Sequence, residues 1–157
     1  MRLLLWQKVL ADAGRAMGLS LKLEVPSDPQ ILCVVRSAVE RFAALAGFSE
    51  EDCRSITLAL DEAMTNIIRH AYGNRHDQTI ELHCRSNEES AEFVLLDHGQ
   101  SVPPEKIRGR RLEDVRPGGL GTHIIAQIMD QVSYEPLPGG NQWKLVKHLP
   151  NKRPQGG

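Results

Sequence analysis

Two consecutive amphipathic helices constrain the fold of this chain more than any other feature of its sequence. The first is predicted to begin at Asp28, with a proline in its first turn, and to end at Gly47. The second is predicted to begin after Ser49, which opens a capping box with an aspartate three residues later, and to run to Gly73. It is expected to be the longest element of the chain. Both apolar stripes need a sheet or further helices to cover them.

Alternation of apolar and polar residues predicts one strand before these helices and two hairpins after them. The predicted strands comprise residues 19–25, 79–85, 91–96, 132–135 and 142–149, and a third helix comprises residues 120–130. Strands that arrive in hairpins favour antiparallel pairing. The fold class is therefore predicted to be α+β, as a two-layer sandwich in which helices cover one face of a mixed, mainly antiparallel sheet.

The length of 157 residues, with 41% apolar and 25% charged side chains, is typical of one globular domain. We expect this domain at residues 19–149. Residues 1–18 are expected to form an amphipathic N-terminal extension for packing or partner contact, and residues 150–157 a disordered tail.

Charge and cysteine usage exclude several classes of function. Nineteen basic and twenty acidic residues give a net charge of −1, which provides no general attraction to nucleic acid or to an anionic membrane. The three scattered cysteines indicate neither a disulfide framework nor a zinc site. With no apolar segment long enough to span a bilayer, the expected location is the cytoplasm, without direct nucleic-acid or membrane partners.

The second helix carries Glu62 and Asn66 four residues apart, so both side chains emerge on one face about one turn from each other. A carboxylate with an amide oxygen is the kind of ligand set that Mg²⁺ accepts while it keeps water and phosphate ligands. Taken alone, the pair is better explained as a solvated helix face.

Two further motifs could bind a ligand. Asp97 and Gly99 end a predicted apolar strand, where the glycine lets a flat group approach the backbone, although a strand-terminal aspartate is also a common turn residue. The glycine-rich residues 117–121 open the third helix, and exposed N–H groups at a helix N-terminus bind anions. The alternative for this segment is a plain glycine-rich loop.

In this order, the three motifs resemble the Bergerat-type nucleotide-binding fold shared by histidine kinases, type II topoisomerases, mismatch-repair proteins and heat-shock chaperone ATPases. Residues 60–72 are similar to the N box of this superfamily, residues 97–99 to its G1 box and residues 119–121 to its G2 box. The first motif contains the sequences Asp-Glu-Ala and His-Ala-Tyr, and no phosphoacceptor helices accompany it. In these respects the chain is most similar to anti-sigma-factor serine kinases of the RsbW and SpoIIAB type.

The resemblance implies that the chain binds ATP or ADP with Mg²⁺. Glu62 would be the general base toward an attacking hydroxyl, and Asn66 would ligand the magnesium ion within the cofactor-binding site. This division of labour agrees with phosphoryl transfer, which needs positioning and charge neutralisation more than covalent chemistry.

The same resemblance assigns the remaining nucleotide contacts. Asp97 would accept a hydrogen bond from the adenine amino group, and Gly99 would flank the ring. Gly119 and Gly121, with the backbone near Thr122, would hold the β and γ phosphates. The basic loop between these motifs, residues 105–116, is expected either to fold over the phosphates as a lid or to remain a solvated loop.

One departure from the family pattern lies in the last hairpin. Members commonly have a threonine there that bonds the adenine side through water, whereas this chain has Asn141 and Gln142. Either residue could substitute for the threonine, or the affinity could be lower.

The function implied is an ATP-dependent protein serine/threonine kinase in a partner-switching circuit. Such a protein binds a sigma factor or another effector, and it phosphorylates a STAS-type antagonist of that binding. A homodimer formed through the first strand is expected. The alternatives are a non-catalytic module that sequesters a partner, against which the presence of Glu62 argues, and a simple ATPase in which water replaces the serine.

Overall fold

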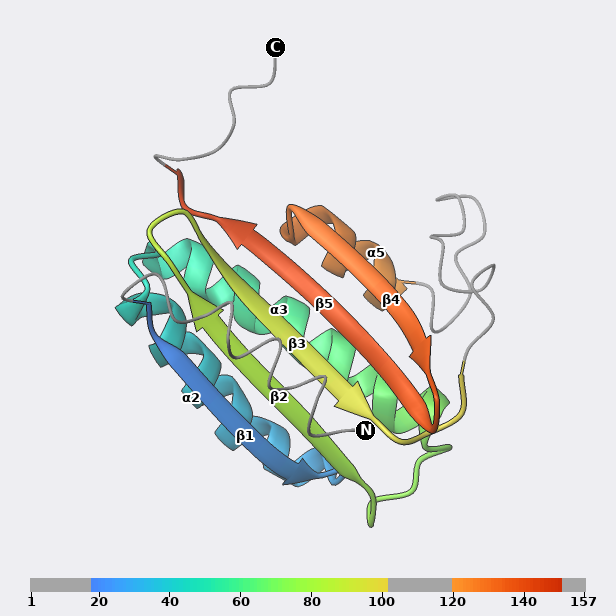
Figure 1. The fold of residues 1–157 in the computed structure, drawn as a ribbon. Helices are drawn as coiled ribbons and strands as arrows, with labels where there is room; N and C mark the ends of the chain where they lie inside the picture. Colours follow the sequence, from blue (N-terminus) through green and yellow to red (C-terminus); the bar gives the residue numbers. More distant parts are fainter. Residues whose placement is uncertain (1–17, 102–119, 151–157) are drawn as a thin grey trace.

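The computed structural model describes residues 18–101 and 120–150, and it has two layers (Figure 1). Helices α2 (Leu32–Leu45), α3 (Glu50–Asn66) and α5 (Leu120–Ile128) all lie on one face of a five-stranded sheet. This arrangement confirms the predicted α+β sandwich. The expected N-terminal helix, the possible lid and the tail lie outside the described residues.

The sheet is antiparallel throughout, in the order β1-β2-β3-β5-β4. Its strands are β1 (Ser20–Pro26), β2 (Thr79–Ser86), β3 (Ser90–Asp97), β4 (Gln131–Leu137) and β5 (Gly140–His148). All four strand pairs are antiparallel, so the antiparallel part of the prediction is correct and the mixed part is not. The connection from β3 through α5 leads to β4, which is not a neighbour of β3, and β5 then returns between the two. Because β3 pairs with β5, the start of β5 lies beside the end of β3.

The core lies between the sheet and the helices. Phe93 and Leu95 of β3 are fully buried, as are Ile56 of α3 and Ile125 of α5. The ring of Phe93 meets that of Phe42 edge to face, with centroids 6.1 Å apart. This packing holds α3 against the middle strands of the sheet. It therefore also sets the position of the C-terminal end of α3.

Both predicted helix starts are confirmed by their caps. The Asp28 carboxylate accepts a hydrogen bond from the backbone N–H of Gln30 at 2.9 Å, and the Ser49 hydroxyl accepts one from Asp52 at 3.1 Å. The first segment begins as a 3₁₀ turn over Pro29–Ile31 before it becomes α2. Side-chain caps satisfy backbone donors that the first helical turn leaves unpaired.

The prediction that the second helix continues unchanged to Gly73 is wrong. α3 is α-helical as far as Asn66, and Ile67–Ala71 form a π-helical turn. The N–H of Tyr72 donates to the carbonyl of Ile67 at 3.0 Å, which is a five-residue step. The wider turn releases the Ala71 carbonyl toward the loop after β3, where it accepts from the N–H of Gln100 at 2.9 Å.

The second hairpin is tighter than predicted. A loop was expected over residues 136–141, but the strands continue to Leu137 and Gly140, and only Pro138 and Gly139 form the turn. Gly139 has a φ of +81°, a conformation that glycine adopts without strain. Pro136 is accommodated within β4 because this strand is at the edge of the sheet and has one neighbour.

No helix in the described part of the chain is long and apolar enough to cross a membrane. The three cysteines are free thiols, with Cys33 exposed and both Cys53 and Cys84 buried.

Candidate functional site

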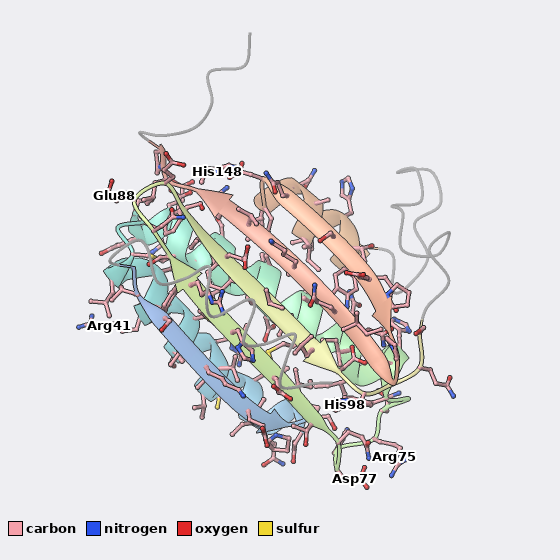
Figure 2. The ribbon with its side chains drawn as sticks, viewed as in Figure 1. Arg41, Arg75, Asp77, Glu88, His98 and His148 are labelled. Carbon is pink, nitrogen blue, oxygen red and sulfur yellow. The ribbon has the colours of Figure 1, made fainter. Side chains whose placement is uncertain are left out.

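The predicted motifs meet at one end of the sheet. Figure 2 shows His98 where β3 ends and β5 begins, at the opposite end from Glu88 and His148. The C-terminal half of α3, the π turn and the loop after β3 converge here, and the start of α5 packs against α3. The site is therefore built from segments far apart in the sequence.

Glu62, Asn66 and Gly121 lie together, as the superfamily motifs imply. A Cβ added to Gly121 would be 2.6 Å from Glu62 Oε2 and 3.6 Å from Asn66 Nδ2. The Asn66 Nδ2 atom is buried and has no hydrogen-bond partner within the described residues. A buried amide nitrogen without a partner is costly, so its position favours a polar ligand.

The neighbouring carboxylate of Asp61 is engaged elsewhere. Its Oδ1 pairs with Arg36 Nη1 of α2 at 2.9 Å, across the contact between the two helices. Successive residues of a helix point about 100° apart, so Asp61 turns toward α2 while Glu62 turns toward α5. Of the two adjacent acids, Glu62 is the one against Gly121.

Asp97 is buried at the end of β3, with an exposed fraction of 2%. Its Oδ1 accepts hydrogen bonds from the Gly99 N–H and from Asn141 Nδ2, both at 2.8 Å. Burial raises the pKa of the Asp97 carboxyl, and these two hydrogen bonds lower it in part. The other oxygen, Oδ2, is buried and has no hydrogen-bond partner in the described part of the chain.

Gly99 is required by the protein backbone itself. A Cβ at this position would be 2.3 Å from the carbonyl oxygen of Ala71, in the π turn. The sequence had suggested that the glycine makes room for a flat ligand, but the group that approaches this face is Ala71. A role for Gly99 beside adenine remains a prediction.

Tyr72 is a site residue to which the sequence analysis assigned no role. It is buried, its hydroxyl donates to the carbonyl of Thr79, and the same oxygen accepts from the His98 N–H at 2.8 Å. Tyr72 thus links the π turn to β2 and to the loop after β3. Its place in the His-Ala-Tyr sequence of the first motif was the one available signal.

Asn141 also belongs to the site, but in a different way from the threonine contact considered above. It is 1% exposed and contacts Asp97 directly, while its Oδ1 accepts from the Tyr134 hydroxyl at 2.6 Å. Register explains the contact, because Asn141 is the residue of β5 that pairs with Asp97 of β3. Gln142, one position on, pairs with Leu96.

The structure describes some of the remaining predicted residues and not others. Thr122 is half-buried in the first turn of α5. Gly119 and the basic loop lie outside the described residues. His70 is exposed at the end of the π turn, and residues 18–101 and 120–150 contain no group of three histidine, cysteine or acidic side chains that could hold a metal ion.

These residues fit a magnesium nucleotide. Asp97 Oδ2 is a buried acceptor that lacks a donor within the described residues, and the amino group of adenine would be such a donor. Glu62 and Asn66 are oxygen-bearing side chains of the kind that bind Mg²⁺, and the close approach of Gly121 leaves the start of α5 without a side chain at that point. A buried carboxylate oxygen suited to a base and oxygen ligands suited to a metal therefore occur at the same end of the sheet.

Comparisons with known proteins agree with this geometry. The family model for the histidine kinase-like ATPase domain matches residues 25–147. The serine-protein kinase RsbW of Oceanobacillus iheyensis is 30% identical over 120 residues, which covers 71% of this chain and 76% of that protein.

Solved structures show the same fold at lower identity. The crystal structure of the RsbU and RsbW domains of a Mycobacterium tuberculosis protein aligns with a TM-score of 0.61 at 15% identity, over 82% of this chain and 31% of that one. The SiaB-SiaC complex from Pseudomonas aeruginosa aligns with a TM-score of 0.55 at 15% identity, over 93% of this chain and 98% of that one. The chain therefore belongs to the histidine kinase-like ATPase family and, within it, to the serine-protein kinases of the RsbW type.

Proposed function

We propose that this chain is an ATP- and Mg²⁺-dependent protein serine/threonine kinase that acts in a partner-switching circuit. The observation that carries the proposal is the position of the Glu62 carboxylate beside Gly121 and Asn66. Nucleotide binding alone needs the glycine and the amide. A carboxylate at the same place adds a group that can accept a proton.

The proposed reaction transfers the γ-phosphoryl group of ATP to a serine or threonine hydroxyl. Glu62 accepts the hydroxyl proton as the oxygen attacks the γ-phosphorus, and ADP leaves with the electrons of the broken phosphorus–oxygen bond. Asn66 would hold the magnesium ion, which supplies charge neutralisation at the phosphates. Asp97 would hold the adenine amino group, with Gly99 beside the ring, and Gly119, Gly121 and Thr122 would bind the phosphates.

The proposed partners follow the family resemblance. The substrate is a STAS-type antagonist protein, and the protein sequestered is a sigma factor or another effector. The SiaB-SiaC structure is a complex of two proteins, and one chain in it has a fold like that of this chain. This likeness supports a protein partner. We further propose a homodimer that works in the cytoplasm.

The test compares two neighbouring acids of α3. Glu62→Gln keeps the shape of the side chain and removes its basicity, whereas Asp61→Asn removes the partner of Arg36 and serves as the matched control. We expect Glu62→Gln to bind ATP as the wild type does and to lose phosphoryl transfer by a factor of about 10²–10⁴, the usual contribution of a general base. Asp61→Asn loses only a partly exposed ion pair, worth at most about 1 kcal/mol.

The assay supplies γ-labelled ATP, Mg²⁺ and each purified STAS-type protein encoded by the same genome, and it separates labelled protein from free phosphate. Label on a serine or threonine that Glu62→Gln abolishes supports the kinase. Free phosphate without labelled protein would replace the proposal with an ATPase. Nucleotide binding with neither product would replace it with a sequestering module.

A further inference from the structure

The amide of Asn141 is within hydrogen-bond distance of four groups of the described residues. Its Nδ2 lies 2.8 Å from Asp97 Oδ1, 3.1 Å from the carbonyl oxygen of Gln100 and 3.4 Å from that of Gly99. Its Oδ1 accepts from the Tyr134 hydroxyl at 2.6 Å. The side chain is 1% exposed, so these contacts are made away from water.

The surroundings of this amide permit one orientation. Three oxygen atoms that can only accept lie around Nδ2, while a hydroxyl that can donate lies against Oδ1. Rotation of the amide by half a turn would place its oxygen against those acceptors and its nitrogen against the tyrosine. The three acceptor oxygens therefore determine that Nδ2 faces Asp97, and the Tyr134 hydroxyl holds the opposite end of the amide by donating to Oδ1.

The position of Tyr134 is itself fixed by packing. Its ring meets that of Trp143 edge to face, with centroids 5.1 Å apart, and Trp143 is 6% exposed. Tyr134 and Trp143 are paired residues of β4 and β5, so the sheet holds both. The aromatic pair formed by the edge strand β4 and its neighbour β5 is thereby linked to the carboxylate at the end of β3 through the amide of Asn141.

This chain of contacts decides which oxygen of Asp97 remains available. Oδ1 already accepts from Asn141 and from the Gly99 N–H, whereas Oδ2 has no partner within the described residues. The amide hydrogens of Asn141 are directed at protein oxygens, so the amide is not left to bind a ligand. Asn141 therefore does not take over the ligand contact of the family threonine.

We infer that Asn141, held in place by Tyr134, is a positioning residue that holds Asp97 with Oδ2 as the acceptor for the amino group of adenine, and that this pair sets the preference for an adenine base. The inference rests on the proposed function, because it takes ATP to be the nucleotide. A base with an oxo group in place of the amino group would direct an acceptor at Oδ2, which is itself an acceptor. Such a base is therefore rejected only while Asn141 keeps the Asp97 carboxylate in this orientation.

The experiment measures the dissociation constants of ATP and of inosine triphosphate for the full chain. Inosine triphosphate carries an oxo group where adenine has its amino group. We expect the wild type to bind ATP at least about tenfold more tightly, and Tyr134→Phe to reduce that ratio by about threefold to tenfold, the effect of one hydrogen bond. The change should lie in the affinity for ATP, with that for inosine triphosphate nearly constant.

Two conservative substitutions and one control variant keep the test from depending on a loss of folding. Tyr134→Phe keeps the ring against Trp143, and Asn141→Thr keeps a donor of smaller size. Gln142→Ala is the matched control, because it changes the next residue of β5, whose side chain lies on the other face of the sheet. We expect Asn141→Thr to retain part of the ratio and Gln142→Ala to retain all of it.

The outcomes separate this inference from the proposed function. Equal weakening of both nucleotides in Tyr134→Phe would reduce Tyr134 to a structural residue and overturn the inference. Unchanged affinities for both nucleotides in Tyr134→Phe would overturn it as well, while the adenine contact of Asp97 would stand. Equal binding of the two nucleotides by the wild type would overturn both the inference and that adenine contact.

Discussion

Alanine at two glycines of the site should separate function from stability. Gly99 and Gly121 both leave no space for a Cβ, but the atoms that a Cβ would meet are of different kinds. At Gly99 they are atoms of Ala71, and the nearest is its backbone carbonyl oxygen, 2.3 Å away. At Gly121 the nearest is Oε2 of Glu62, 2.6 Å away, at the end of a flexible side chain.

The distances give the size of each effect. Contacts of a Cβ below 3.0 Å are not tolerated, so Gly99→Ala must move the Ala71 backbone by 3.0 − 2.3 = 0.7 Å or more, and Gly121→Ala must move the Glu62 carboxylate by 3.0 − 2.6 = 0.4 Å. Forced overpacking costs about 1–3 kcal/mol, and loss of the hydrogen bond between Gln100 and Ala71 adds about 1 kcal/mol. At about 2–4 °C per kcal/mol, Gly99→Ala should lower the melting temperature by about 4–16 °C.

For Gly121→Ala the carboxylate can rotate away, and alanine favours the helix by up to about 1 kcal/mol over glycine. We expect a melting temperature within about 3 °C of the wild type, together with a large loss of phosphoryl transfer, because the displaced group is the proposed base. Thermal unfolding without nucleotide and the phosphoryl-transfer assay measure the two effects. The reasoning assumes that the Glu62 side chain moves while the helix stays in place. A loss of stability in Gly121→Ala as large as that in Gly99→Ala would refute this assumption.

Three further predictions concern buried groups. Tyr72→Phe leaves two backbone groups without their partner, so denaturant unfolding should show a free energy of unfolding lower by about 1–3 kcal/mol. Asp97→Asn should gain stability relative to the wild type as the pH rises from about 4.5 to about 7.5, because burial raises the carboxyl pKa of the folded protein and deprotonation then costs stability; a constant difference in melting temperature would contradict this. A thiol reagent should modify Cys33 alone in the native protein, since burial raises the pKa of Cys84 to about 12 and also raises that of the buried Cys53; rapid modification of three thiols before unfolding would exclude it.

Local patterns predicted the elements whose boundaries are set locally. Asp28 and Ser49 cap their helices through contacts two or three residues away, and alternation in residues 79–97 follows from one buried face. Such signals need no knowledge of the rest of the chain. The pairing of Glu62 with Asn66 on one helix face was predictable for the same reason.

Features that depend on distant contacts were not predictable. Ile67 and Ile68 continue the helical spacing of α3, so nothing in the local sequence indicates a π turn; its wider loop is supported by a contact from Ala71 to Gln100. The contact between Asn141 and Asp97 depends on strand register, 44 residues apart in the sequence. Proximity of Gly121 to Glu62 was expected from the family motifs and not from any local pattern.

The π turn also constrains the number of residues between Asn66 and Tyr72. Five residues, 67–71, separate Asn66 from Tyr72, and deletion of one of them would restore an ordinary helix while turning every later side chain by about 100°. Tyr72 could then no longer reach His98, and the Ala71 carbonyl would leave Gln100. During evolution this segment can thus exchange residues more freely than it can gain or lose one, so the spacing of asparagine and tyrosine should mark distant relatives in which the intervening residues have changed.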